Sequence, residues 1–320
     1  MRTLPEQLPA ADIPMKLCGD IGGTKVLLAL ADNDGVLHRK CRLASAEFAC
    51  FDDLLGGYLG AAPEHIDGGC LAVAGPVAED GRTARITNLP WRIDCAALET
   101  RFKLGRLNLV NDFAAVARGV TAMTQEELVV LQSGAPAARG VRLVLGAGTG
   151  MGVAALLGDT VLSSEGGHIA FGPNDETQAE LWSTLHREYG RVTAERVVSG
   201  PGLALIHRFL GGERIDAETI GTRALAGDAA ARRSTDLFFA CYGAFAGDLA
   251  LAFMARSGVV LAGGVTQKLL PLLADSPFLG AFNAKHEHAG LVAGMPVSVV
   301  ADPDIGLRGA ASEAINTTLC

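Results

Sequence analysis

Two glycine-rich segments carry residue types and a spacing that could bind phosphate. The first reads Gly-Asp-Ile-Gly-Gly-Thr-Lys over residues 19–25, and the second reads Gly-Ala-Gly-Thr-Gly-Met-Gly over residues 146–152. Apolar runs flank both segments, so each is predicted to be a turn between two strands. Glycines let backbone N–H groups point at a bound anion without side chains in the way. The pair predicts two phosphate-facing hairpins, one from each half of a duplicated architecture.

The first turn also has a plainer interpretation, because paired glycines supply positive φ in ordinary hairpins. Asp20 argues against that interpretation, since a carboxylate beside glycines and a threonine is an unusual choice for a tight turn. The same carboxylate suits Mg²⁺ held through water beside phosphate oxygens. A Walker-type phosphate loop is excluded, because neither turn ends in Gly-Lys-Ser or Gly-Lys-Thr.

The second turn has an alternative as the opening of a dinucleotide-binding βαβ unit. Glu165 lies at about the right distance downstream for a ribose contact. The glycines, however, follow G-x-G-x-G-x-G rather than G-x-G-x-x-G, and the apolar run after them ends at Gly158-Asp159. A hairpin strand fits better than a crossover helix. An NAD-dependent oxidoreductase remains an alternative that hydride transfer without ATP use would support.

Five polar residues form a second group with possible chemistry. Asn111 and Asp112 stand where a predicted strand meets a predicted helix, a position at which helix capping is the plainer interpretation. Glu165 and His168 are separated by two glycines, so a helical metal pair is disfavoured and a loop that hydrogen-bonds several hydroxyls is favoured. Glu195, taken alone, could be a solvated helix position.

Bulk properties narrow the function classes. The chain has 320 residues, 49% hydrophobic and 19% charged, which is globular composition and enough for two domains. Its net charge of −8 argues against nucleic acid as a partner. Seven scattered cysteines favour a reducing cytoplasm over a disulfide framework or a zinc site. We expect no membrane span, no secretory signal and a loose tail over residues 1–15. His286-Glu287-His288 is interpreted as an exposed charged segment rather than a metal site.

Strands alternate with helices in both halves, which predicts an α/β protein with mixed sheets. Residues 16–41 are predicted to form a three-stranded antiparallel meander that turns at Asp34-Gly35. Helices are predicted over 51–61, 93–102, from about 113, over 177–210, 233–254 and 305–316. Strands are predicted over 69–76, 107–110, 258–265 and 297–300, and a hairpin pair of strands over 141–162. We place a small domain at 16–120 plus 303–320 and a large domain at 121–302.

Seven motifs in order make the chain resemble the bacterial glucokinases, in the ATP-dependent hexokinase group of the actin-like ATPase-domain (ribonuclease H-like) fold. The likeness covers nearly the whole chain from residue 16. The motifs are the two glycine turns, Thr87-Asn88 with Trp91, residues 110–113, 166–168, 194–202 and 262–264. The resemblance implies two domains with an interdomain cleft, ATP and Mg²⁺ as cofactors, glucose as substrate, a cytoplasmic location and a homodimer.

Residue roles also follow from the resemblance. It implies that glucose is bound by Asn111, Asp112, Glu165, His168 and Glu195. It implies that nucleotide and phosphates are bound by Gly19, Asp20, Ile21, Gly22, Gly23, Thr24, Gly148, Thr149, Gly150, Gly263 and Gly264. Asp20 would hold Mg²⁺ through water. Asp112 would be the general base that accepts the proton of the 6-hydroxyl as ATP phosphorylates glucose to glucose 6-phosphate, the first step of glycolysis.

Two departures mark this chain within the resemblance. Lys25 stands where the group usually has asparagine. Lysine at this position is common in the related repressor–ORF–kinase family. That family carries a cysteine-rich zinc motif after the Gly-His pair, whereas residues 171–175 here contain no cysteine. A sugar-responsive regulator on the same fold is a further alternative, disfavoured because about 15 residues before the core are too few for a helix-turn-helix. Strictness for glucose, the phosphate donor, the oligomeric state and the effect of Lys25 are left open.

Overall fold

The computed structural model describes residues 14–60 and 65–316, and it divides into two compact units. Unit 1 comprises Met1–Met123 and Asp304–Cys320, and unit 2 comprises Thr124–Pro303. The sequence placed these divisions at 120/121 and 302/303, three residues and one residue earlier. Residues 1–13 of the expected tail lie outside the described part of the chain. The predicted end of the tail at residue 15 is wrong, because Met15 is the buried first residue of a strand.

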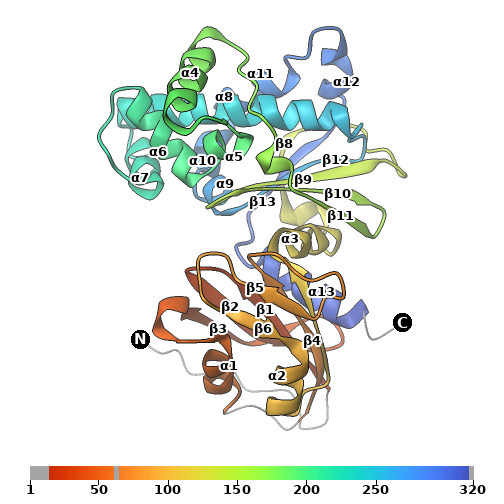
Figure 1. Ribbon diagram of the computed structural model, residues 1–320. Coiled ribbons are helices and arrows are strands. Elements are labelled where there is room, and N and C mark those ends of the chain that lie inside the picture. The colour runs from red at the N-terminus through yellow and green to blue at the C-terminus, as the bar shows by residue number, and fades with distance from the viewer. Residues whose placement is uncertain (1–13, 61–64, 317–320) are drawn as a thin grey trace. The chain divides into compact units, whose positions relative to one another are not determined.

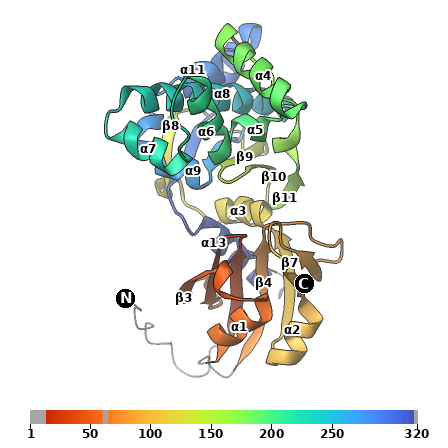
Figure 2. The same cartoon turned by 60° about the vertical axis from the view of Figure 1, so that its left-hand side comes forward.

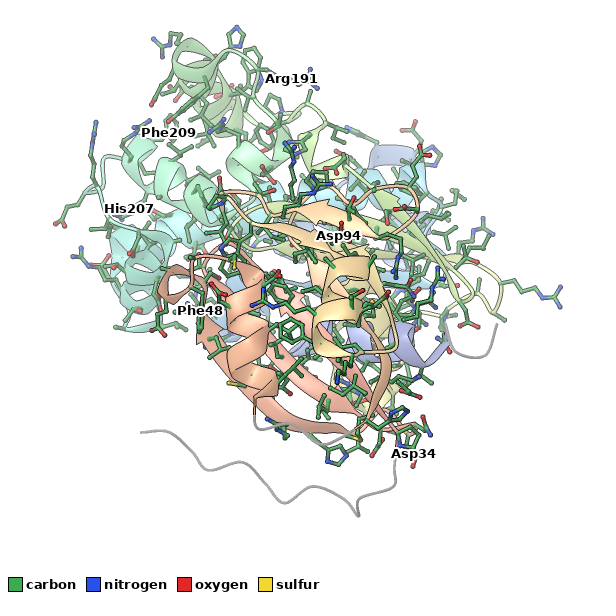
Figure 3. The ribbon with its side chains drawn as sticks, turned by 60° about the horizontal axis from the view of Figure 1, so that its bottom comes forward. Asp34, Phe48, Asp94, Arg191, His207 and Phe209 are labelled. Carbon is green, nitrogen blue, oxygen red and sulfur yellow. The ribbon has the colours of Figure 1, made fainter. Side chains whose placement is uncertain are left out.

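The sheet of unit 1 has five strands in the order β3-β2-β1-β4-β7 (Figure 1). Its strands are β1 (Met15–Ile21), β2 (Lys25–Ala31), β3 (Leu37–Ala44), β4 (Ile66–Val73) and β7 (Arg106–Asn111). β1, β2 and β3 pair antiparallel, which confirms the predicted meander, and its second turn includes Asp34 (Figure 3). β1, β4 and β7 pair parallel, so the sheet is mixed.

The register of the parallel strands brings three chain segments to one edge of this sheet. Ile21 pairs with Val73, and Val73 pairs with Asn111, so the three strands end in one row. Ligands of open α/β sheets bind outside the carboxyl ends of the strands. Asp20 and the residue pair Asn111–Asp112 therefore lie at the edge where a ligand is expected.

Helices cover both faces of the sheet of unit 1. One face packs large side chains, such as Leu17 and Leu71, against α1 (Phe51–Leu59) and α2 (Cys95–Phe102). The other face packs small ones, such as Ala29, against residues of α3 (Asp112–Thr121) and α13 (Ile305–Asn316). Since side chains alternate along a strand, Asp20 lies on the α3–α13 face with Cys18. Residues of the hairpin of β5 (Thr83–Arg85) and β6 (Arg92–Asp94) pack on the first face. The helix predicted from residue 93 begins two residues later, because Ile93 and Asp94 belong to β6.

The sheet of unit 2 has six strands in the order β11-β10-β9-β12-β13-β8. They are β8 (Leu128–Gln132), β9 (Val141–Ala147), β10 (Met151–Leu157), β11 (Thr160–Ser164), β12 (Gly258–Ala262) and β13 (Val297–Val300). Figure 2 shows the helices of this unit gathered together, with α8 (Ala229–Ala252) among them. Buried side chains of α8, including Phe238 and Tyr242, form the core with the sheet.

Local signals explain where the remaining helices begin and end. The single helical region predicted over 177–210 is wrong, because it is three helices. Gly190 (φ +72°) ends the first, the Thr193 side chain caps the second, and the Ser199 side chain caps the third. The helices of unit 2 besides α8 are α4 (Glu176–Tyr189), α5 (Ala194–Val197), α6 (Gly200–Phe209), α7 (Ala217–Leu225), α9 (Gly264–Lys268), α10 (Leu270–Leu273), α11 (Phe278–Asn283) and α12 (Ala289–Ala293). Among the described residues, no helix is long and apolar enough to cross a membrane.

Candidate active site

The first glycine turn connects β1 and β2 and is closed by a hydrogen bond from the Gly22 amide to the Lys25 carbonyl (2.9 Å). Neither Gly22 nor Gly23 has a left-handed backbone, so positive φ is not the reason for these glycines. The reason is close approach: a Cβ on Gly22 would lie 3.2 Å from the Lys25 carbonyl oxygen, and one on Gly23 would lie 3.2 Å from that of Thr87. Thr24 and Lys25 are exposed. The turn thus presents backbone and short or cationic side chains, as a phosphate site requires.

The first and third residues of the same motif serve the core as well. Gly19 lies inside β1, where a Cβ would come within 2.8 Å of Leu71 and 3.1 Å of Leu28. The Ile21 side chain is fully buried. Any contact of these two residues with a ligand would therefore have to come from the backbone.

Asp20 is a half-buried carboxylate beside the start of α13. A Cβ on Gly306 would lie 3.2 Å from its Oδ2 atom. Burial raises the pKa of Asp20, the nearby Asp304 adds to the rise, and Lys25 opposes it. A cation beside Asp20 would offset this cost of burial. Mg²⁺ uses one or two carboxylates together with phosphate oxygens and water rather than a full protein cage. Among the described residues, no group of three or more His, Cys, Asp or Glu side chains could hold a metal ion.

Asn111 and Asp112 lie at the junction of β7 and α3. The Asn111 Oδ1 atom accepts hydrogen bonds from the amides of Phe113 (3.0 Å) and Ala114 (3.2 Å), so the capping interpretation is confirmed. The Oδ1 atom of Asp112 accepts a bond from the Phe113 amide (2.8 Å). Capping uses the side-chain oxygen of Asn111, so the Nδ2 atom of its side chain is the group that a ligand would meet. One position therefore serves both the helix and a possible ligand.

The second glycine turn, between β9 and β10, is fixed by bonds from two directions. Gly148 donates to the Gly150 carbonyl (2.9 Å), and its own carbonyl accepts from the Gly200 amide (2.8 Å). The Met151 amide donates to the Oε2 atom of Glu195 (2.8 Å). These bonds connect the turn to the segment 194–200 within unit 2.

Glu165 and His168 stand at the ends of a short 3₁₀ turn over Gly166–His168. Their side chains are 88% and 59% exposed, with 3.8 Å between Glu165 Oε2 and His168 Nε2, so both can meet a ligand. A Cβ on Gly167 would come within 2.1 Å of the Met151 carbonyl oxygen, which fixes this turn against the second glycine turn. Unit 2 thus brings Glu165, His168 and Glu195 to the neighbourhood of one phosphate-binding candidate.

The segment that carries Glu195 pairs with the segment after His168. The Ala194 amide donates to the Ile169 carbonyl (2.9 Å), and the Phe171 amide donates to the Val192 carbonyl (3.0 Å). Arg191, labelled in Figure 3, donates to the His168 carbonyl (3.3 Å). The plainer interpretation of Glu195 as a solvated helix position is wrong, because it is half-buried and hydrogen-bonded.

Gly263 and Gly264 follow β12. The strand predicted over 258–265 ends at Ala262, because Gly263 adopts φ +89° and Gly264 begins α9. A Cβ on Gly263 would lie 2.4 Å from the Ala147 carbonyl oxygen, whereas Gly264 has open space around it. Gly264 is therefore the one of the pair with room for a ligand. The residues His286–His288 form an exposed 3₁₀ turn, as interpreted from the sequence.

Asn88 is a residue whose conformation the sequence did not reveal. It has a left-handed backbone (φ +65°), and its Cβ would lie 3.9 Å from a Cβ on Gly23. The Thr87 amide donates to the Ala74 carbonyl just past the end of β4 (2.8 Å). Thr87-Asn88 therefore lies at the same edge as the first glycine turn. Asn tolerates a left-handed backbone better than most residues do, and this preference is the only local sign of the conformation in the sequence.

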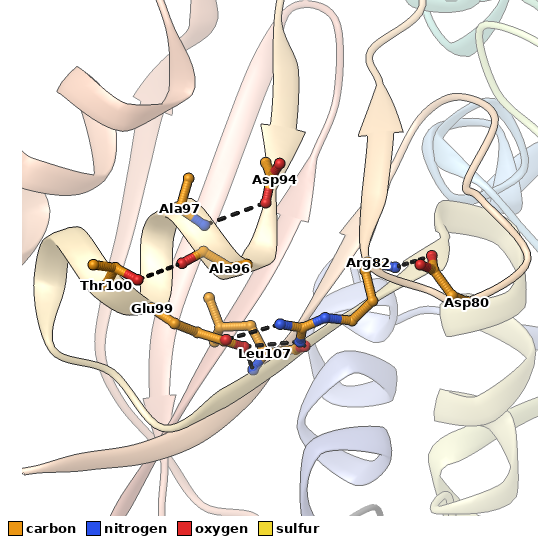
Figure 4. Close-up of polar contacts among 8 residues, drawn as sticks. All are labelled: Asp80, Arg82, Asp94, Ala96, Ala97, Glu99, Thr100 and Leu107. Atoms are coloured by element: carbon orange, nitrogen blue, oxygen red, sulfur yellow. Dashed lines mark hydrogen bonds and ion pairs between the residues drawn. The ribbon is translucent and has the colours of Figure 1, made fainter.

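An ion pair supports the strand that carries Asn111 (Figure 4). Arg82 donates from both Nη atoms to the two carboxylate oxygens of Glu99 (2.8 Å each), and Nη1 also donates to the Leu107 carbonyl. The Leu107 amide donates back to Glu99 (2.7 Å). β7 is the edge strand of its sheet, so Arg82 and Glu99 satisfy backbone groups that have no partner strand. Sequence spacing gave no sign of this pair.

Comparisons with known proteins bear on this site. The sequence model of the glucokinase family matches residues 17–317. A glucokinase of Xanthomonas campestris pv. campestris is 36% identical, with 94% of this chain and 95% of the relative aligned. A glucokinase of Nostoc sp. is 34% identical, with 92% and 97% aligned.

Solved structures give the same fold. Glucokinase from an Antarctic psychrotroph superposes with a TM-score of 0.82 at 30% identity, covering 95% of this chain and all of that one. A repressor–ORF–kinase family glucokinase of Streptomyces griseus reaches 0.68 at 20% identity, covering 94% and 99%, and shows the fold alone. The fold is that of the actin-like ATPase-domain sugar kinases, and the chain belongs to the glucokinase family.

Proposed function

We propose that this protein transfers the γ-phosphoryl group of ATP to the 6-hydroxyl of glucose, giving glucose 6-phosphate and ADP, as the first step of glycolysis. The observation that carries the proposal is the edge of the five-stranded sheet, where the first glycine turn, Asp20 and Asn111–Asp112 end in one row of paired residues. The relatives are named glucokinases. A glucokinase of Balamuthia mandrillaris with the same fold was solved with glucose, and that of Streptomyces griseus with glucose and AMPPNP.

Both units carry residues that we expect to bind the nucleotide. From unit 1, Asp20 and the backbone of Gly19, Ile21, Gly22, Gly23 and Thr24 would face the phosphates. From unit 2, Gly148, Thr149 and Gly150 would face them, and Gly263 and Gly264 would lie against the adenosine. Asp20 would hold Mg²⁺ through water. Mg²⁺ bound with ATP supplies neutralisation of the charge on the phosphate oxygens.

Asn111, Asp112, Glu165, His168 and Glu195 would bind the hydroxyls of glucose. Hydrogen bonds to charged groups contribute roughly 1.5–3 kcal/mol each, which suits carboxylates for recognising sugars. Asp112 would accept the proton of the 6-hydroxyl while O6 forms its bond to the γ-phosphorus. The bond between that phosphorus and the bridging oxygen then breaks, and ADP leaves with its electron pair. A positioned base of this kind contributes about 10²–10⁴-fold.

A panel of sugars crossed with phosphate donors tests the proposal. We expect glucose with ATP and Mg²⁺ to give the highest rate of glucose 6-phosphate formation, and ADP or polyphosphate to replace ATP poorly. Asp112→Asn should lose at least about 10²-fold in kcat while still binding glucose. Wild-type protein that fails to phosphorylate any hexose would overturn the proposal, and full activity of Asp112→Asn would overturn the assignment of the base.

We also propose that the protein works as a homodimer in the cytoplasm. Six cysteines of the described residues are free thiols. Burial raises the pKa of Cys18 to about 12 and that of Cys95 to about 11, so these thiols stay protonated and unreactive. Free thiols suit a reducing compartment. Light scattering after size-exclusion chromatography tests the dimer, and a mass near 33 kDa would contradict it.

A further inference from the structure

One carboxylate in unit 2 contacts the second glycine turn directly. The Met151 amide donates to the Oε2 atom of Glu195 at 2.8 Å. Met151 is the first residue of β10, so the bond is made where the turn ends. A hydrogen bond to a charged acceptor is shorter and stronger than one between neutral groups. This bond therefore fixes the backbone that follows Gly148, Thr149 and Gly150.

The space around Glu195 shows why the turn ends in glycine. A Cβ on Gly150 would lie 2.5 Å from the Oε2 atom of Glu195 and 3.3 Å from its carboxyl carbon. Gly150 has no left-handed backbone, so its conformation does not require glycine. The absence of a side chain is needed because the Glu195 carboxylate occupies that space. By contrast, a Cβ on Gly148 would meet no atom closer than 4.0 Å.

The segment around Glu195 is held independently of this bond. The Thr193 side chain caps α5 by accepting from the Arg196 amide (3.2 Å), and the Ala194 amide pairs with Ile169 next to His168. Glu195 therefore starts from a rigid segment and reaches the turn, rather than being carried by the turn. Of its two carboxylate oxygens, Oε2 holds the Met151 amide, so Oε1 is the oxygen with which a sugar hydroxyl would bond.

We propose that Glu195 is a positioning residue for the nucleotide as well as a ligand of the sugar. Its Oε2 atom would hold the phosphate-binding turn in place while its Oε1 atom accepts a hydroxyl of glucose. The two substrates would then be coupled through one carboxylate, and such coupling is reciprocal by thermodynamic necessity. This inference rests on the proposed function, because it takes the second turn as a phosphate site and Glu195 as a sugar ligand.

Two substitutions of Glu195 separate the roles. Glu195→Gln keeps an oxygen that can accept from the Met151 amide, whereas Glu195→Ala keeps none. The probe is AMPPNP with Mg²⁺, titrated by calorimetry in the absence of sugar. We expect Glu195→Ala to lose roughly 10-fold in AMPPNP affinity, the size of a lost charged hydrogen bond, and Glu195→Gln to stay close to wild type. Both variants should lose glucose affinity when glucose is titrated alone.

A second pair of variants leaves Glu195 in place and tests the coupling from the other side. Gly150→Ala would push the Glu195 carboxylate away from its place, so glucose affinity measured without nucleotide should fall several-fold. Gly280→Ala, at an exposed position of α11 in the same unit with no atom within 4 Å of its Cβ position, should leave that glucose affinity unchanged. Thermal melting of each variant checks that it is folded.

The outcomes are distinct. Glu195→Ala with wild-type AMPPNP affinity, or Glu195→Gln with a loss equal to that of Glu195→Ala, would overturn the positioning role. Equal glucose affinities for Gly150→Ala and Gly280→Ala would overturn the coupling. A wild-type protein that phosphorylates no hexose would instead refute the proposed function.

Discussion

The crossing of α3 and α13 offers a sharp test of how unit 1 positions its candidate residues. The two helices pack side by side in unit 1 (Figure 2), with an ion pair between Arg118 and Glu313 (2.8 Å). A Cβ on Gly309 of α13 would lie 1.7 Å from the Ala115 carbonyl oxygen of α3. Gly309→Ala therefore requires the helices to separate by about 1.8 Å before that contact reaches ordinary van der Waals distance.

The size of the effect follows from this geometry. Overpacking a core costs about 1–3 kcal/mol, and the obstacle here is a backbone carbonyl, which cannot rotate away as a side chain can. Alanine regains up to about 1 kcal/mol through its higher helix propensity. Because the obstacle is rigid, we take the upper end of the overpacking cost, so the expected net loss in the free energy of unfolding is about 2 kcal/mol. In a domain of the size of unit 1, that loss lowers the melting temperature by roughly 4–8 °C.

Activity should suffer more than stability, because α3 begins at Asp112 and α13 begins beside Asp20. A displacement of about 1 Å at reacting groups can cost on the order of 10²-fold in rate. The assay is kcat for glucose phosphorylation together with thermal melting. Gly57→Ala is the matched control, since Gly57 is exposed in α1 and has no atom within 4 Å of its Cβ position. A Gly309→Ala variant with wild-type melting temperature and kcat would refute the reasoning.

Three further predictions concern unit 1. Asn88→Gly should melt at or above the wild-type temperature, and Asn88→Ala should lose about 1 kcal/mol, because φ is +65° at this position; equal stabilities would contradict the role of strain. The hydrogen bond from Arg82 lowers the pKa of Glu99 below its usual 4.5, so this pair stabilises the fold above that pH and loses its contribution as the pH falls further. Urea unfolding of Glu99→Gln at pH 7 and pH 4 should show a deficit of about 1 kcal/mol at pH 7 that shrinks on acidification, and a constant deficit would argue against the ion pair. Asp112→Asn should retain its calorimetric affinity for glucose within a few-fold, since the amide NH2 group can still donate a hydrogen bond to the oxygen of the 6-hydroxyl although it cannot accept its proton, and loss of binding would indicate a structural role instead.

Sequence patterns predicted the elements whose signals are local. β13 and α13 have the predicted bounds, and the β1–β3 meander is as expected, because apolar periodicity and glycine punctuation suffice there. The region 177–210 was misread for the opposite reason. Its helical periodicity continues through residues 190–199, where Gly190 and the side chains of Thr193 and Ser199 break the chain into separate helices.

The candidate site could be predicted in its residue types but not in its contacts. Glycines, carboxylates and an Asn-Asp pair are visible in the printed chain, and their order supports the resemblance to the family. The bond between Glu195 and Met151 joins residues 44 positions apart, so no local pattern could show it. The same holds for Gly23, whose neighbour across space is the Thr87 carbonyl rather than another part of its own hairpin.

The position of α13 explains why unit 1 is built from two distant parts of the chain. The face of β1 and β4 that bears Asp20 is lined by small residues, Cys18, Cys70 and Ala72, which only a closely packed helix can cover. Residues of α13 fill that face, and Lys40 of β3 pairs with Asp304 just before the helix (2.5 Å). The same helix brings Gly306 against the Asp20 carboxylate, where any other residue would place a Cβ 3.2 Å from Oδ2. Burial of Asp20, which raises its pKa and makes a cation favourable beside it, is therefore supplied in part by residues that lie nearly 300 positions away in the sequence.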